Sequence, residues 1–422
     1  MQKYQFLILV VYLLVQAAQY WLDLLNIRHM KQYGMTVPAG FEGQIDESVL
    51  KKAVSYTLER NRVGLIESVI GSVVLIIFLY AGLLNLYGNR LSSFALPFPV
   101  QGLLFFLFLS YASSFLSIPF SLYTTFRIEN KYGFNTMTLK LWVTDFIKST
   151  LILTVLMGIA LFCGFWIVQK SPAHWWLFGW GFFFIFSIFM MYVSPYVIEP
   201  LFNRFTPLEG DTLEEKIKTM MQKTGIRISR VFRMDASKRS RHTNAYFTGI
   251  GKTKRIVLYD TLINKMDEDE VLAVLAHEAG HWKKKHVLKM IVVFEALSLA
   301  GAYIAFRVLS TGLLAEVFGL RGSAFFAELV ILSFIFSILV FPFTPLFSVF
   351  SRRHEREADR FAVGLAPKPD ALATSLIKLS KDNLSNLHPH PLYAWFYYSH
   401  PPVVERARKI REMAKGDEQT GR

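Results

Sequence analysis

The sequence predicts a mainly α-helical protein that crosses a membrane several times. Hydrophobic residues make up 53% of the chain and aromatic residues 15%, while only 18% are charged. With 38 phenylalanines in 422 residues, this composition is too apolar for an ordinary soluble protein. Seven apolar stretches also reach or approach the roughly 20 residues that a helix needs to cross the hydrocarbon core of a bilayer. We therefore expect seven transmembrane helices, with polar segments that fold outside the membrane.

The seven predicted spans are spread along most of the chain. They lie near residues 5–25, 64–86, 99–122, 146–168, 175–200, 287–309 and 324–348. The first stretch could instead be a cleaved signal peptide, because Lys3 precedes it and the small residues Ala17 and Ala18 lie within it. Its apolar character continues through Leu25, beyond the usual length of a signal sequence, so we expect it to remain as a span.

Basic residues alternate from one side of these spans to the other. Four segments hold six, three, seventeen and thirteen Lys and Arg residues, and these are 26–63, 123–145, 201–286 and 349–422. One such residue occurs in each of the opposite loops, 87–98, 169–174 and 310–323. The positive-inside rule therefore places the basic segments in the cytoplasm and the N-terminus on the opposite side. The net charge of +14 then reflects orientation and contact with anionic lipid, and we expect no nucleic-acid partner because no such motif accompanies it.

A metal-binding motif, His-Glu-Ala-Gly-His, occupies residues 277–281, shortly before the sixth predicted span. On a helix, His277 and His281 lie on one face and can bind a single zinc ion, with Glu278 beside them as a general base. Such a motif arises by chance in about one chain of this composition in a hundred, so its surroundings must decide. Together with the apolar spans, the motif predicts a zinc metalloprotease embedded in a membrane.

The polar segment between the fifth and sixth spans has secondary structure of its own. Residues 212–224 have the pattern of a short amphipathic helix. Residues 229–235, 243–249 and 255–260 have the β-branched and aromatic character of strands, so we expect a small antiparallel sheet. An exposed edge strand of that sheet can hold an extended peptide over the metal.

The helix that carries the motif has a clear N-terminal signal. Asp267 is the predicted N-cap, Glu270 is its capping-box partner, and Glu268 and Asp269 favour the positive end of the helix dipole. Three lysines at 283–285 end the helix just before the sixth span. This order places the metal near the cytoplasmic membrane surface, within reach of a membrane-tethered substrate.

A third metal ligand must come from another part of the chain. The only cysteine, Cys163, lies inside the fourth predicted span, so the ligands must be nitrogen and oxygen atoms. After the seventh span, Glu355 and Asp359 share one face of a predicted helix, so Glu355 can bind zinc while Asp359 accepts a hydrogen bond from a ligating imidazole. Taken alone, this Arg- and Glu-rich segment is more typical of a solvated helix, and only the 277–281 motif reverses that preference.

These segments divide the chain into four parts. Residues 1–200 hold transmembrane helices one to five, and 201–286 form a cytoplasmic catalytic segment with the motif helix. Residues 287–348 hold the last two transmembrane helices. Residues 349–422 form a cytoplasmic segment that supplies the third ligand and substrate-site residues.

Together the motifs resemble the type I CAAX prenyl proteases, integral-membrane zinc endopeptidases that process the C-termini of isoprenylated proteins. The resemblance covers nearly the whole chain: seven spans, the 277–281 motif between spans five and six, and a Glu-x-x-x-Asp pair after span seven. Three further phrases fit the same family, namely ENKYGFN at 129–135, HTNAYF at 242–247 and YSHPP at 398–402, the last followed by Glu405 and Arg406. Separate matches in the same order are more specific than any one of them.

The resemblance implies a role for individual residues at the metal. His277, His281 and Glu355 are the ligands of one zinc ion, and Glu278 is the general base and acid. Asp359 supports one of the ligating histidines. The resemblance also implies that the seven helices enclose a large water-filled chamber.

Three more residues are implied to act on the substrate. Asn244 holds the substrate backbone near the edge strand, while His400 and Arg406 stabilise the transition state or orient the substrate. From the residues alone, His400 would be a histidine that satisfies the turn before two prolines, and Arg406 a solvated helix residue. We assign no role to His286.

We therefore expect a zinc endopeptidase that cleaves near the C-terminus of membrane-associated, CAAX-type prenylated substrates and is embedded in the lipid bilayer. One alternative is a membrane quality-control protease of the HtpX type, and another is a non-catalytic zinc-binding transporter or scaffold. The C-terminal residues carry no endoplasmic-reticulum retrieval signal, so we favour a bacterial inner membrane, with the endoplasmic reticulum as the location in a eukaryote. In a bacterium no farnesylated partner is implied.

Overall fold

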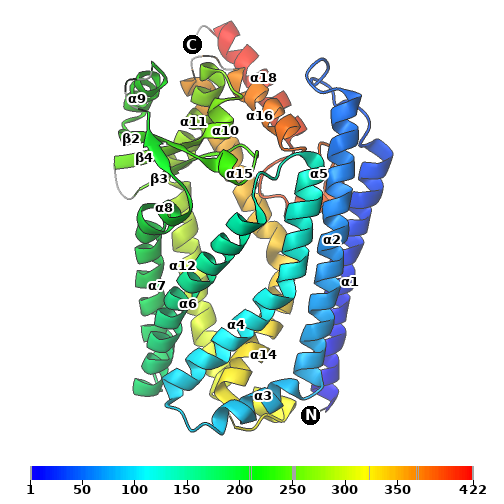
Figure 1. The fold of residues 1–422 in the computed structure, drawn as a ribbon, viewed down its shortest axis with the longest axis vertical. Helices are drawn as coiled ribbons and strands as arrows, with labels where there is room; N and C mark the ends of the chain where they lie inside the picture. The colour runs from blue at the N-terminus through cyan, green and yellow to red at the C-terminus, as the bar shows by residue number, and fades with distance from the viewer. Residues whose placement is uncertain are drawn as a thin grey trace.

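The structure is a computed structural model that describes residues 2–208, 210, 212–249, 253–322, 324–366, 368 and 370–420. Long helices form a tall bundle, and shorter helices and a small sheet form a cap at one end of it (Figure 1). The C-terminus lies at the capped end and the N-terminus at the other. We call the sheet together with five helices the polar cap; these are α9 (Thr212–Thr224), α10 (Asp260–Ile263), α11 (Glu268–Lys283), α16 (Ala371–Asp382) and α18 (Val403–Thr420).

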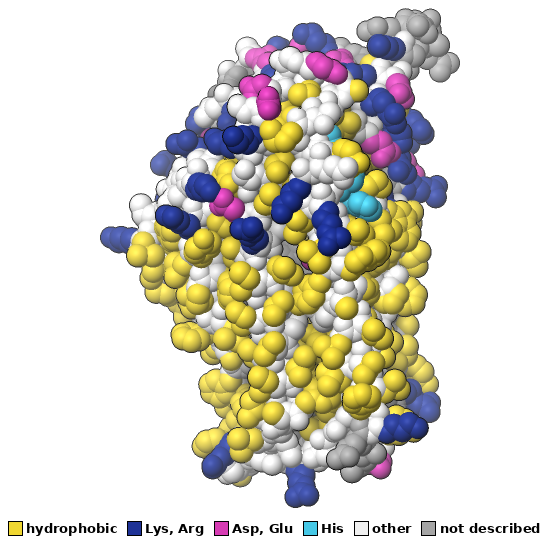
Figure 2. Space-filling model, turned by 90° about the vertical axis from the view of Figure 1, so that its right-hand side faces the viewer, with side chains coloured by type: hydrophobic (Ala, Val, Ile, Leu, Met, Phe, Trp, Pro, Cys, Tyr) yellow, Lys and Arg dark blue, Asp and Glu magenta, His cyan; other side chains and the backbone are white. Residues whose placement is uncertain are grey.

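Seven helical stretches of the described chain are long and apolar enough to cross a membrane, which confirms the predicted number. They contain α1 (Gln2–Tyr33), α2 (Glu47–Tyr80), α4 (Phe98–Tyr123), α6 (Leu139–Lys170), α7 (Trp175–Val193), α12 (His286–Leu309) and α14 (Ala324–Val340). A π-helical turn extends α4 into α5 (Asn130–Tyr132), and another extends α7 into α8 (Glu199–Phe202). On the face seen in Figure 2, apolar side chains form a band between two charged ends, as a lipid-exposed surface requires.

The second predicted span, 64–86, is wrong at its C-terminal end. The helix α2 stops at Tyr80, and α3 (Leu83–Ser92) begins after two intervening residues. Between them Gly82 adopts a left-handed backbone with φ of 80°, which costs glycine little because it has no Cβ. Apolar residues continue through this turn, so hydrophobicity alone did not reveal the break.

The polar cap contains one mixed four-stranded sheet. Its strands are β1 (Phe205–Pro207), β2 (Arg227–Met234), β3 (Ala245–Thr248) and β4 (Thr253–Tyr259), in the order β1-β2-β4-β3. The predicted antiparallel sheet is wrong for one pair, because β2 and β4 run parallel. After β2 the chain crosses to the far edge and returns as the β3–β4 hairpin, which inserts β4 in the middle. This arrangement leaves β3 as an edge strand.

The helix α11 (Glu268–Lys283) lies at the centre of the polar cap. Its capping box forms as predicted: Asp267 accepts a hydrogen bond from the Glu270 backbone amide at 2.9 Å, and Glu270 accepts one from the Asp267 amide at 3.1 Å. Its neighbours are α9 (Thr212–Thr224), which has its predicted bounds, α10 (Asp260–Ile263), α16 (Ala371–Asp382) and α18 (Val403–Thr420). The shared apolar core includes Ile217, Met221, Ile256, Leu258, Val271 and Leu275.

The elements that carry the predicted metal ligands continue directly into membrane helices. A short turn with Pro342 joins α14 to α15 (Thr344–Leu365), which leaves the bundle and enters the polar cap. The other ligand helix, α11, is joined at its C-terminal end to the membrane helix α12 by a turn of two residues. The position of the site is therefore fixed relative to the membrane by both of its helices.

Candidate active site

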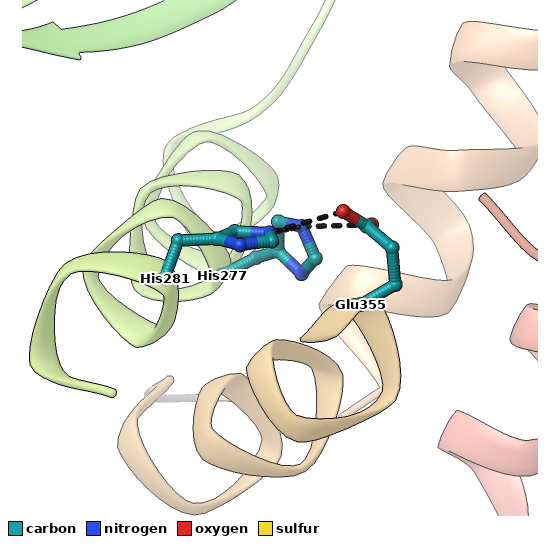
Figure 3. Close-up of side chains that lie close together, drawn as sticks. All are labelled: His277, His281 and Glu355. Atoms are coloured by element: carbon teal, nitrogen blue, oxygen red, sulfur yellow. Dashed lines mark hydrogen bonds and ion pairs between the residues drawn. The ribbon is translucent and has the colours of Figure 1, made fainter. Parts of the chain in front are cut away.

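Two helices bring the three predicted metal ligands together. His277 and His281 extend from one face of α11, and Glu355 reaches them from α15 (Figure 3). The two Nε2 atoms lie 3.1 Å apart. Glu355 places Oε2 3.4 Å from Nε2 of His277 and Oε1 3.2 Å from Nε2 of His281. One ligand atom from each of the three residues thus lies within 4.8 Å of the others.

This donor set fits a zinc ion. His277 and Glu355 are buried, yet Oε2 of Glu355 has no hydrogen-bond partner. Nε2 of His277 at 3.4 Å and Nη1 of Arg406 at 3.5 Å are near this oxygen but do not form hydrogen bonds with it. A buried carboxylate oxygen without a hydrogen-bond donor is costly, and a metal ion bound to it would offset that cost. Two imidazole nitrogens and one carboxylate, with a position left open, are also the ligands of many catalytic zinc sites.

The close approach of α15 to α11 depends on Gly280. A Cβ atom at this position would lie 3.0 Å from Cα and 3.1 Å from O of Ala358, which are backbone atoms that cannot rotate away. Glycine at 280 therefore lets the turn of α15 that carries Glu355 come close to the two histidines.

We expect Gly280→Val to push the two helices apart and to weaken zinc binding. Inserting a side chain into a close-packed contact costs about 1–3 kcal/mol, so the thermal unfolding midpoint of the purified protein should also fall. Gly364→Val on α15, the other helix of this contact, is the control, because a Cβ there meets nothing within 4 Å. Equal zinc affinity in both variants would show that this helix contact does not position the ligands.

Asp359 and Arg406 support His277 from behind. Oδ1 of Asp359 lies 2.9 Å from Nδ1 of His277, so the imidazole can present Nε2 to a metal. Arg406, from α18, donates two hydrogen bonds to Asp359, at 2.6 and 3.0 Å, and its Nη1 lies 3.5 Å from Oε2 of Glu355. All of these groups are buried. Arg406 therefore contacts the ligands and their support rather than bulk solvent.

The charge around His277 makes metal binding sensitive to pH. Burial alone would lower the pKa of this imidazole, but its interactions with the Asp359 and Glu355 carboxylates outweigh burial and raise the pKa to about 9. A ligating imidazole must lose its proton before it binds a metal. The affinity for zinc should therefore rise by about tenfold per pH unit from pH 6 towards 9 and then level off. Chelator competition at a series of pH values measures this, and an affinity that does not change between pH 6 and 8 would contradict it.

Glu278 follows His277 on α11. Burial raises the pKa of its carboxyl group, although the neighbouring charges of His277 and His281 counteract part of this shift. A raised pKa brings a carboxylate closer to the value at which a general base works best near neutral pH.

His400 lies on the open side of the site. Its Nε2 is 3.3 Å from Oε1 of Glu355, and 61% of its side chain is exposed. Burial of the rest of the ring lowers the pKa of His400, which favours a neutral imidazole at pH 7. Ser399 Oγ lies 2.9 Å from its Nδ1, and when this hydroxyl donates the hydrogen bond the imidazole carries its proton on Nε2.

Asn244 is exposed at the start of the edge strand β3. Its side-chain oxygen accepts a hydrogen bond from the Ala245 amide at 2.8 Å, and its backbone oxygen accepts one from Tyr259 at 3.1 Å. The asparagine is therefore anchored to the sheet at the strand where an extended peptide could be added.

Sequence reasoning missed two residues next to the ligands. Nδ1 of His286 lies 3.1 Å from Nδ1 of His281, and Nε2 of His286 lies 3.0 Å from Oε2 of Glu357. Helical spacing gave no sign of this contact, because α11 ends before His286 and the chain turns sharply between them.

Two family models cover most of the chain. The model for the CAAX prenyl protease N-terminal domain with five membrane helices matches residues 26–204, and the model for peptidase family M48 matches residues 207–414. The boundary between them falls where the five N-terminal spans end and the polar cap begins.

Relatives and a solved structure match over most of their lengths. CAAX prenyl protease 1 homolog from Arabidopsis thaliana is 36% identical over 407 residues, with 92% of this chain and 93% of that protein covered. Metalloprotease YhfN from Bacillus subtilis is 31% identical, with 77% of this chain and 76% of that protein covered. The crystal structure of S. mikatae Ste24p superposes with a TM-score of 0.88 and 29% identity, and covers 96% of this chain and 98% of that one.

Proposed function

This chain belongs to peptidase family M48, in the group with the CAAX prenyl protease N-terminal domain, and from that membership we propose that it is a zinc endopeptidase for membrane-tethered CAAX-type substrates. It is a multi-pass membrane metalloprotease. The observation that carries the zinc proposal is the convergence of His277, His281 and Glu355, with one oxygen of the carboxylate lacking a donor.

Zinc held by these three side chains would polarise the scissile carbonyl and lower the pKa of water. Glu278 then accepts the proton of the attacking water and passes it to the leaving amine. Its raised pKa supports both steps, because the carboxyl group must first take and then release a proton. Asp359 keeps His277 oriented through the reaction, and Arg406 keeps Asp359 in place.

We propose that His400 stabilises the negative charge that develops on the carbonyl oxygen. An Nε2–H on its partly exposed ring can face a substrate at the ligands. A neutral imidazole with its proton on Nε2 suits this role, because it can donate a hydrogen bond to the developing oxyanion. Arg406 acts indirectly, because its positive charge lies near the metal ligand Glu355.

The substrate proposal rests on the open edge of β3 and on the membrane. A peptide added to this strand would extend past Asn244 and α11, and main-chain hydrogen bonds would hold it in an extended form. A lipid-modified C-terminus would remain close to the bilayer because each ligand helix is joined by a short turn to a membrane helix, α15 to α14 and α11 to α12. The named relatives supply the substrate class, a CAAX C-terminus.

We further propose that the polar cap faces the cytoplasm. The basic segments that the positive-inside rule assigns to that side include the catalytic segments 201–286 and 349–422. The four-part division proposed from the sequence follows the same topology. The bacterial inner membrane remains our proposal for its location.

The test is cleavage of a farnesylated CAAX peptide and its unprenylated twin by the purified protein in detergent. We expect cleavage near the C-terminus of the farnesylated peptide, loss of activity after zinc is chelated, and recovery when zinc is restored. Cleavage confined to the loops of misfolded membrane proteins would favour the HtpX-type alternative. A protein that binds zinc and cleaves neither substrate would favour a non-catalytic role.

A further inference from the structure

A chain of polar contacts extends from His281 away from the metal ligands. Its first link is between Nδ1 of His281 and Nδ1 of His286, at 3.1 Å. The second link joins Nε2 of His286 to Oε2 of Glu357, at 3.0 Å. His286 is only 2% exposed, whereas 29% of the Glu357 side chain is exposed, so the chain begins in the interior and ends near solvent.

One arrangement of protons satisfies every link of this chain. If Nε2 of His281 binds a metal, its Nδ1 carries the proton and donates a hydrogen bond to Nδ1 of His286. His286 then carries its own proton on Nε2 and donates a hydrogen bond to the Glu357 carboxylate. In this arrangement both imidazoles are neutral and Glu357 is ionised, and each contact joins one hydrogen-bond donor to one acceptor.

Neighbouring side chains hold His286 and Glu357 in this geometry. The His354 ring stacks on the His286 ring with centroids 4.0 Å apart and planes 12° apart. Arg353 donates a hydrogen bond from Nε to Oε1 of Glu357 at 3.3 Å, and leaves Oε2 for the histidine.

A strained turn delivers His286 to this place. Lys285 has a left-handed backbone with φ of 57°, which is unfavourable for a residue with a side chain. This residue lies between the end of α11 and the start of α12, and the turn directs the first residue of α12 back towards His281. Strain of this kind persists where the surrounding contacts require it.

We propose that His286 is a positioning residue that fixes the orientation and tautomer of the metal ligand His281, and that Glu357 does the same for His286. The proposal rests on the proposed metal site. The two histidine ligands then differ in the group that orients them. The Asp359 carboxylate contacts Nδ1 of His277 directly, whereas the imidazole of His286 contacts Nδ1 of His281. The proposal also makes the second ligand depend on α12, so that the metal site and a membrane helix are joined through one side chain.

The experiment measures the dissociation constant of zinc by chelator competition with purified full-length variants in detergent. His286→Phe keeps a ring against His354 but removes both nitrogens, and we expect it to weaken zinc binding by about 10- to 100-fold. His286→Asn restores an acceptor for His281 and should recover part of the affinity. Glu357→Leu should weaken binding by a smaller factor, and adding it to His286→Phe should have no further effect.

His354→Phe is the matched control, because it keeps the stacked ring beside His286; its zinc affinity should stay within about threefold of the wild type. The thermal midpoint of each metal-free variant separates an effect on the site from an effect on folding. If His286→Phe does not fold, Glu357→Leu decides, and wild-type affinity in that variant overturns the proposal. Independent, multiplying effects of the two substitutions would also overturn it. If the wild-type protein binds no zinc, the proposed metal site itself has failed, which is a different result.

Discussion

Glu278→Gln should abolish peptide cleavage while zinc stays bound. The amide is nearly isosteric with the carboxylate but cannot accept the proton of the attacking water, and loss of a general base typically lowers turnover by about 10²- to 10⁴-fold. The three proposed zinc ligands are unchanged in this variant. Cleavage rates of the farnesylated peptide and zinc content of the same preparation are the two measurements.

Glu268→Gln provides the comparison for this result. It changes the same residue type on the same helix, but Glu268 lies at the exposed first turn of α11, next to Lys216. We expect its turnover to remain close to that of the wild type. Undiminished cleavage by Glu278→Gln would remove Glu278 as the base, and loss of zinc from that variant would assign it a structural role instead.

Features that depend on nearby residues could be predicted from the sequence. Apolar length marked the seven spans, and the amphipathic pattern marked α9 over its full extent. The capping box of α11 was predicted from Asp267 and Glu270 alone, because both partners lie within one helical turn. In each case the physical cause lies within the segment that shows the pattern.

Features that depend on the path of the chain could not be predicted. Three of the four strands were recognised, but β2 and β4 are parallel because the chain first forms the edge strand β3 and then returns beside β2. Strand character does not specify that order. The break after Tyr80 is caused by a single glycine within an apolar run. The contact between His281 and His286 depends on a left-handed lysine, for which the sequence gives no signal.

The candidate site combines features that depend on nearby residues with features that depend on the path of the chain. Spacing alone put His277 and His281 on one face of a helix, because the helical period is fixed. Their meeting with Glu355 joins segments far apart in the chain and needs the close contact at Gly280, which only the folded structure shows. Helical spacing predicted that Glu355 and Asp359 share one face of a helix. The hydrogen bonds from Arg406 on α18 to Asp359 depend on the packing of distant segments, so spacing did not predict them.

Arg406→Gln should destabilise the metal-free protein by about 3–5 kcal/mol, because breaking a buried ion pair leaves its partner charge without compensation. The guanidinium group is 8% exposed and is shared between Asp359 and Glu355, so two buried carboxylates lose their cation at once. Denaturant titration of the detergent-solubilised protein measures the loss. Arg408→Gln on the same α18 is the control, because Arg408 is 68% exposed and pairs with Glu412 at 3.8 Å. Its effect should stay within about 0.5 kcal/mol.

A double variant tests whether the loss comes from the unpaired carboxylate. Asp359→Asn removes one buried negative charge, so the pair Arg406→Gln and Asp359→Asn should be more stable than the sum of the two single losses predicts. The deficit that remains reflects Glu355, which the guanidinium also contacts and which zinc would neutralise. Addition of zinc should therefore stabilise the double variant as well, provided that His277 still presents Nε2 without the carboxylate behind it. Strictly additive losses would mean that Arg406 stabilises the polar cap through its packing and not through its charge.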